Sequence, residues 1–259
     1  MVSHLITSLI AKQAKLVIDQ SKNILRHQKF GLSSWRSYQR TVVRRDSAFS
    51  FIDRLNPDNV IYGIIGVNVG VFGLWQWSMS DRRTFKQMTD NFMISYYGIF
   101  QKHRYHTFFT SFFSHKDTLH LLLNMFMLYM FGPEIIYLLG VRRFLMLYTS
   151  GGFISGACHV FAPLFLPKSF PSRYSYFLYS PAMGASGAVN GIVIFHVLTY
   201  PTRILWLYFI IPIPALLAGT MFVLKDVYGL YLGDTGMGNA GHLGGAATGA
   251  LYFLRRMMR

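Results

Sequence analysis

The chain has 259 residues, of which 52% are hydrophobic and only 14% are charged. Soluble domains carry about 25% charged residues, so this composition favours a membrane protein over a water-soluble enzyme. The net charge of +15 does not indicate nucleic-acid binding, because the basic residues lie mostly in the first 55 positions and between apolar runs. A single cysteine, Cys158, excludes an intramolecular disulfide and a cysteine-based metal cluster, and no metal or other cofactor is expected.

The first 55 residues form a basic arm without a membrane-spanning run. They hold ten Lys or Arg residues and three acids, and one helical face carries apolar side chains (Leu5, Ile6, Leu9 and Ile10). With frequent Ser and Arg further on, this composition is typical of a mitochondrial presequence. The alternative is a solvated arm that only helps to orient the protein. A secretory signal fits less well because its apolar core is missing.

Residues 56–259 contain six apolar runs, each close to the roughly 20 residues that a transmembrane helix needs. We therefore predict an all-α membrane protein, a bundle of six transmembrane helices. The runs cover residues 60–78, 118–139, 144–166, 182–200, 204–224 and 239–254.

An even number of spans places both termini on one side of the lipid bilayer. That side then holds 16 of the 25 Lys and Arg residues, and the opposite side holds nine. Basic residues concentrate on the side from which a membrane protein is not translocated. Both termini should accordingly face the matrix or the cytoplasm.

Spans two, four and six then begin on the opposite side, and each carries a polar residue near its start. These residues are His120, Ser186 and His242. At about 1.5 Å per residue they should lie within ~10 Å of the interface and at similar depth, so they are able to meet. Asn124 follows His120 on the same helix face. A hydroxyl nucleophile needs a neighbouring base, and acyl transfer needs donors for the oxyanion, so these four residues together favour a hydrolytic site.

Each of these residues also has a purely structural interpretation. Glycines around Ser186 and the Gly241, Gly245 and Gly249 stripe allow close helix packing. Two further histidines are possible bases. His196 lies about 15 Å deeper than Ser186 on the same helix and cannot reach it. His159, near the end of span three, lies at a comparable depth and stays an alternative to His242.

The chain resembles the rhomboid intramembrane serine proteases in three segments, which occur in order on alternate spans. The segments are SHKDTLHLLLNM, GASG and GHLGG. YSPAMGASGAVNG and IPIPALLAGTMFVLKD are similar to mitochondrial rhomboids of the plant and algal type. The resemblance covers about residues 60–254.

The resemblance implies that Ser186 is the nucleophile and His242 the general base, a dyad without an acidic third member. It also implies that the Ser186 N–H and the side chains of His120 and Asn124 hold the oxyanion. Where many bacterial rhomboids have an aromatic residue one turn after the serine, this chain has Asn190, whose amide is a possible orienter of His242. The Trp-Arg pair common in the family's first long loop is absent from 79–105. The Glu that the family frequently has four residues after the glycine matching Gly132 is Ile136 here.

The function expected from these observations is cleavage of transmembrane segments by a serine endopeptidase of the mitochondrial inner membrane, open to the intermembrane space. Its partners would be single-span membrane proteins. The alternative is a rhomboid-like pseudoprotease that binds membrane clients without cleavage. A transporter is disfavoured because the spans are expected to lack buried acids and the polar cluster is shallow. Pro212 and Pro214 are expected to kink span five, either as a static bend or as a lateral gate for substrate.

Overall fold

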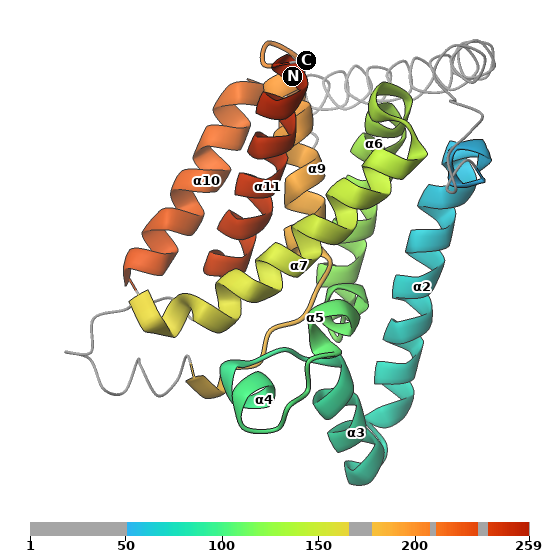
Figure 1. The fold of residues 1–259 in the computed structure, drawn as a ribbon, viewed down its shortest axis with the longest axis vertical. Helices are drawn as coiled ribbons and strands as arrows, with labels where there is room; N and C mark the ends of the chain where they lie inside the picture. Colours follow the sequence, from blue (N-terminus) through green and yellow to red (C-terminus); the bar gives the residue numbers. More distant parts are fainter. Residues whose placement is uncertain (1–50, 166–177, 208–210, 233–237, 259) are drawn as a thin grey trace, which may run out of the picture.

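The computed structural model describes residues 51–165, 178–207, 211–232 and 238–258 (Figure 1). Nearly all of the basic arm, and with it the predicted presequence, lies outside these described residues. Six long helices account for most of the described chain. They are α2 (Pro57–Ser78), α6 (Thr118–Leu139), α7 (Val141–Phe165), α9 (Ser186–Thr199), α10 (Ala215–Leu232) and α11 (Asn239–Met257).

Four of these helices are long and apolar enough to cross a membrane, namely α2, α6, α7 and α10. Helix α9 is apolar but has only 14 residues. The prediction of a helical membrane protein is therefore confirmed. Each of the six apolar runs overlaps one long helix, whereas six complete crossings stay a prediction.

Helix α9 lies at the centre of the bundle and packs against α6, α7, α10 and α11. The hydrophobic core is continuous across α2, α6, α7 and α9, and its fully buried members include Leu128, Ile135, Phe144, Ile192 and Phe195. Because α9 is surrounded, polar side chains at its start are held among other helices.

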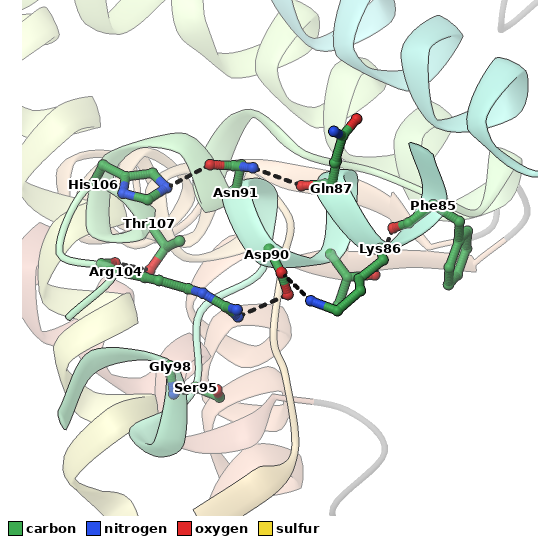
Figure 2. A network of polar contacts seen from close by, with 11 residues as sticks. Phe85, Lys86, Gln87, Asp90, Asn91, Ser95, Gly98, Arg104, His106 and Thr107 are labelled. Atoms are coloured by element: carbon green, nitrogen blue, oxygen red, sulfur yellow. Dashed lines mark hydrogen bonds and ion pairs between the residues drawn. The ribbon is translucent and has the colours of Figure 1, made fainter. Parts of the chain in front are cut away.

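The chain between α2 and α6 folds into short elements at one end of the bundle: α3 (Arg82–Phe92), α4 (Tyr96–Phe100), α5 (Thr107–Thr110) and the 3-10 turn η2 (Ser111–Phe113). A similar turn, η1 (Ile52–Arg54), precedes α2. Figure 2 shows the polar contacts that hold this end together. Asp90 accepts from Lys86 at 2.5 Å and from Arg104 at 2.8 Å, and His106 Nε2 lies 3.1 Å from Asn91 Oδ1. The contacts of Asp90 with Arg104 and of Asn91 with His106 join α3 to the chain that precedes α5.

The prediction of one helix over residues 204–224 is wrong. Strands β1 (Ile204–Leu207) and β2 (Ile211–Pro214) pair as an antiparallel hairpin instead, with Ile204 opposite Pro214 and Trp206 opposite Pro212. The two prolines lack the N–H groups that a helix requires, and the surrounding β-branched residues favour strands. Pro212 and Pro214 thus precede the helix rather than kink it, and the predicted gate at a proline kink is not present.

Helix α10 begins directly after the hairpin and extends eight residues beyond the predicted end at residue 224. Its first two N–H groups donate to chain that follows α9: Ala215 N to Arg203 O at 2.7 Å and Leu216 N to Pro201 O at 3.0 Å. The helix continues through Lys225 and Asp226, which lie just past the predicted end of span five.

Candidate active site

Ser186 and His242 lie side by side on two neighbouring helices. Ser186 is the first residue of α9 and His242 is the fourth residue of α11. The distance from Ser186 Oγ to His242 Nε2 is 3.0 Å, within the range of a hydrogen bond. The two residues are 56 positions apart in the sequence, so packing of α9 against α11 creates the pair.

Glycines permit this packing. A Cβ atom at Gly245 of α11 would overlap the backbone of Gly187, and a Cβ atom at Gly249 would overlap the backbone of Gly191. The two backbones approach this closely only because both helices present glycine at the contact. Ser186 directly precedes one of these glycines and His242 is three residues from another, so the contact sets their separation.

Backbone hydrogen bonds anchor the segment that leads into Ser186. Ala182 pairs with Ile94 through two hydrogen bonds of 2.9 and 2.8 Å. Gly184 N then donates to Ser111 O at 2.9 Å. Ile94 of the 79–106 segment and Ser111 of η2 thus hold the chain that leads into Ser186.

His115 completes this anchoring and was not identified from the sequence. Its Nε2 accepts from the N–H of Ala185, the residue before Ser186, at 3.2 Å. The ring is fully buried. Burial, with a smaller contribution from the charge of His120, lowers the pKa of His115 from 6.5 to about 3, so the ring stays neutral and keeps the lone pair that it needs as an acceptor. The available signal was its place five residues before His120 in SHKDTLH.

His120 lies against Gly184, two residues before Ser186, and Asn124 lies one turn further along α6. A Cβ atom on Gly184 would meet the His120 ring at 2.6 Å, and Gly184 has a φ of +127°. Both observations require glycine at this position. The His120 ring packs edge-on against His115 with centroids 4.9 Å apart. Asn124 is buried, and its Nδ2 donates to the His120 carbonyl at 2.8 Å.

Asp226 is a further residue at the site that the sequence interpretation missed. Its Oδ1 lies 3.3 Å from His242 Nδ1, on the side of the ring opposite Ser186. Asp226 is 1% exposed. The expectation of spans without a buried acid is therefore wrong, and an acid lies beside His242, where the resemblance implied a dyad without an acidic third member. An unpaired carboxylate inside an apolar helix is costly, which was the available signal.

Two other predicted roles are not supported by the contacts, and a third prediction agrees with them. Asn190 is buried, but its Nδ2 has no hydrogen-bond partner within the described part of the chain, and Asp226 takes the position expected for it at His242. His159 Nε2 lies 3.1 Å from the backbone oxygen of Ser180, not at Ser186. His196 bonds Glu134 at 3.0 Å near the other end of α9, in agreement with the predicted separation from Ser186.

This arrangement has the parts that acyl transfer requires. A serine hydroxyl at the start of α9 lies against an imidazole nitrogen, and the imidazole of His120 lies against Gly184, two residues before Ser186. A hydroxyl becomes a useful nucleophile when an adjacent base accepts its proton. Donors aimed at the developing oxyanion lower the barrier most effectively where water is largely excluded.

Comparison with known proteins matches residues 102–259 to the family described as "Rhomboid domain". The chain is 34% identical over 211 residues to "RHOMBOID-like protein 12, mitochondrial" of Arabidopsis thaliana, covering 79% of this chain and 60% of the relative. It is 32% identical over 202 residues to "Rhomboid protein 1, mitochondrial" of Saccharomyces cerevisiae, covering 77% and 54%. It is also 32% identical over 196 residues to "Presenilin-associated rhomboid-like protein A, mitochondrial" of Danio rerio, covering 74% and 46%. The chain thus spans less than two thirds of the length of each of these relatives.

Proposed function

Because the chain belongs to the rhomboid family, we propose that it is a serine endopeptidase that cleaves transmembrane segments of other membrane proteins. The observation that carries this proposal is the 3.0 Å contact between Ser186 Oγ and His242 Nε2 across α9 and α11. A hydroxyl and an imidazole at this distance allow direct proton transfer.

In the proposed reaction, Ser186 Oγ attacks the carbonyl carbon of the scissile peptide bond while His242 Nε2 takes the hydroxyl proton. His242 then gives this proton to the leaving amine as the C–N bond breaks, which leaves an acyl-enzyme. Water attacks the ester carbonyl, again with His242 as the base, and releases the second product. The Ser186 N–H, His120 and Asn124 are proposed to stabilise the oxyanion in both steps.

The length of α9 supports a site that is below the membrane surface but open to water. Fourteen residues span about 21 Å, whereas the hydrocarbon core is about 30 Å thick. If the end of α9 lies at one surface, Ser186 lies roughly 9 Å below the other. This depth suits a reaction that needs both a transmembrane substrate and a water molecule.

The similarity to relatives named as mitochondrial makes this a mitochondrial membrane protein, and we place it in the inner membrane with the site open to the intermembrane space. Proposed substrates are single-span proteins of that membrane. Their extended segments would reach Ser186 from the end of the bundle that carries α3 and α4 (Figure 1).

The test combines a fluorescent fluorophosphonate probe with cleavage of a single-span substrate by purified protein. Ser186→Ala should abolish both labelling and cleavage. His242→Ala should reduce cleavage to the same extent, with little further loss in the double variant, because nucleophile and base act as a unit. Ser150→Ala is the matched control, since this hydroxyl donates to Met146 O within its own helix, and it should leave both signals intact.

Binding of the substrate without cleavage or labelling would instead identify a pseudoprotease. Substantial turnover by His242→Ala, together with an inactive His159→Ala, would show that the base is His159 and not His242.

A further inference from the structure

The buried carboxylate of Asp226 lies on the far side of the proposed base. Asp226 belongs to α10, and its side chain is 2% exposed although the helix is otherwise apolar. Its Oδ1 is 3.3 Å from His242 Nδ1, while His242 Nε2 is 3.0 Å from Ser186 Oγ. The three side chains therefore form one continuous line across α10, α11 and α9.

The chemistry of these atoms selects one form of the His242 ring. An ionised carboxylate can only accept hydrogen bonds, so Nδ1 must carry the proton that bonds to Oδ1. In the neutral ring Nε2 then has a free lone pair, which faces the Ser186 hydroxyl. This is the form in which His242 can accept the serine proton.

We propose that Asp226 is a positioning residue that orients His242, selects its Nδ1-protonated tautomer and stabilises the imidazolium formed when Ser186 attacks. This inference rests on the proposed function and extends it from two residues to three. Asp226 keeps its negative charge throughout. His242 Nε2 passes the Ser186 proton to the leaving amine and later passes a proton from the attacking water back to Ser186 Oγ as the ester bond breaks.

A purely structural role for Asp226 would be its ion pair with Lys225. Lys225 Nζ lies 3.1 Å from Oδ1, but its side chain is 47% exposed and directly adjacent in sequence. An ion pair with a half-exposed lysine contributes little to stability, so it does not account for burial of the carboxylate. His242 contacts the same carboxylate oxygen from the neighbouring helix α11, and its side chain is only 15% exposed.

The other groups around His242 do not replace this interaction. His120 of α6 is close enough to interact electrostatically with His242, but it is not an acid. Phe222 of α10 presents its ring at 6.4 Å, and α9 contributes the Ser186 hydroxyl. Among the described residues, the carboxylate that contacts the His242 ring is that of Asp226.

The test measures kcat, KM and the pH profile of substrate cleavage for Asp226→Asn. Asparagine keeps the size of the side chain but removes the charge and can turn its NH₂ toward Nδ1, which favours the wrong tautomer. We expect kcat to fall about 10²- to 10⁴-fold with little change in KM. The acid limb of the kcat/KM profile should move to lower pH, because a neutral amide stabilises the imidazolium less than a carboxylate does.

Two matched variants separate this role from a structural one. Lys225→Gln removes the ion pair but not the contact with His242, and it should keep most of the activity. Glu134→Gln removes another acid that contacts a histidine, His196, away from Ser186, and it should leave the acid limb in place. Asp226→Glu, which restores the charge, should recover part of the lost kcat.

Nitrogen NMR of the His242 ring provides a measurement that needs neither activity nor an altered Asp226. In Ser186→Ala protein we expect a protonated Nδ1 and an unprotonated Nε2 at neutral pH. The opposite tautomer overturns the inference even if Asp226→Asn does not fold. If the native protein is active and Asp226→Asn keeps both its kcat and the acid limb of its pH profile, the inference about Asp226 is overturned as well, while the proposed function survives. A native chain that neither cleaves nor reacts with the probe refutes the proposed function instead.

Discussion

Several buried polar residues at or near this site have partners on other elements. His115 accepts from Ala185, Asp226 contacts His242, and Trp75 Nε1 donates to Ser114 Oγ at 2.7 Å. Buried polar groups destabilise a fold unless they are paired, so each pair restrains the two elements that it joins. The restraint is useful here because it acts on Ser186 and on the histidine beside it.

His115 leads to a prediction about pH and stability. Its pKa in the folded protein is about 3, below the ordinary 6.5. Between these values the unfolded chain binds a proton that the folded chain does not, so stability is complete above pH 6.5 and falls as the pH drops toward 3. The slope from one such group is at most about 1.4 kcal/mol per pH unit.

The measurement is the melting temperature of the purified protein in detergent at pH 7.5 and pH 5. His115→Gln does not titrate and offers an oxygen to the Ala185 N–H, so its melting temperature should depend less on pH. His106→Gln, a change at an exposed histidine, serves as the control and should keep the native dependence. Identical pH dependence in the native and His115→Gln proteins would show that His115 is not the group responsible.

At the scale of elements, the contact between α9 and α11 decides whether the site exists. A side chain at Gly245 would overlap the backbone of Gly187, whereas a Cβ atom at Gly66 of α2 would have nothing within 4 Å. The same chemical change therefore has opposite structural consequences at two glycines, both of which occur in apolar helices.

We predict that Gly245→Ala separates α9 from α11 and thereby moves His242 away from Ser186. Overpacking of this kind costs about 1–3 kcal/mol, and a displacement near 1 Å can lower turnover about 10²-fold. Gly66→Ala should leave thermal stability and fluorophosphonate labelling unchanged. If the two variants behave alike in melting and labelling, the glycine contact does not set the geometry of the site.

At the scale of the whole molecule, the start of α2 and the end of α11 lie at one end, and α3 and α4 lie at the other (Figure 1). The end with the start of α2 and the end of α11 also carries basic residues: Arg54 before α2, Arg142 and Arg143 in the first turn of α7, and Arg255 and Arg256 at the end of α11. This distribution supports the proposal that these ends face the matrix.

We predict that a tag after Arg259 is protected from added protease when the outer mitochondrial membrane is opened and the inner membrane is intact. A tag inserted between Ser80 and Asp81, in the turn before α3, should be digested under the same conditions. Digestion of the C-terminal tag alone would reverse the proposed orientation.

Much of this organisation can be predicted from local sequence. Apolar runs near 20 residues predict α2, α6 and α7 because membrane helices satisfy their own backbone hydrogen bonds. The glycine stripe at Gly241, Gly245 and Gly249 predicts a close helix contact, because small residues on one face let two helix backbones approach each other. Ser186, His120 and His242 were also identifiable as a group, since each follows the start of a run on the same side.

The remaining features depend on contacts between distant parts of the chain. Residues 204–214 are apolar enough for a helix, but pairing of Ile204 with Pro214 makes them a hairpin and shifts α10 toward its C-terminal end. That shift brings Asp226 into the helix and against His242, and only the packing of α10 on α11 could reveal this contact. His115 likewise reaches Ala185 across 70 residues. Hydrophobicity is a local property that predicts where helices form, whereas the partner of a buried polar atom depends on which helices become neighbours.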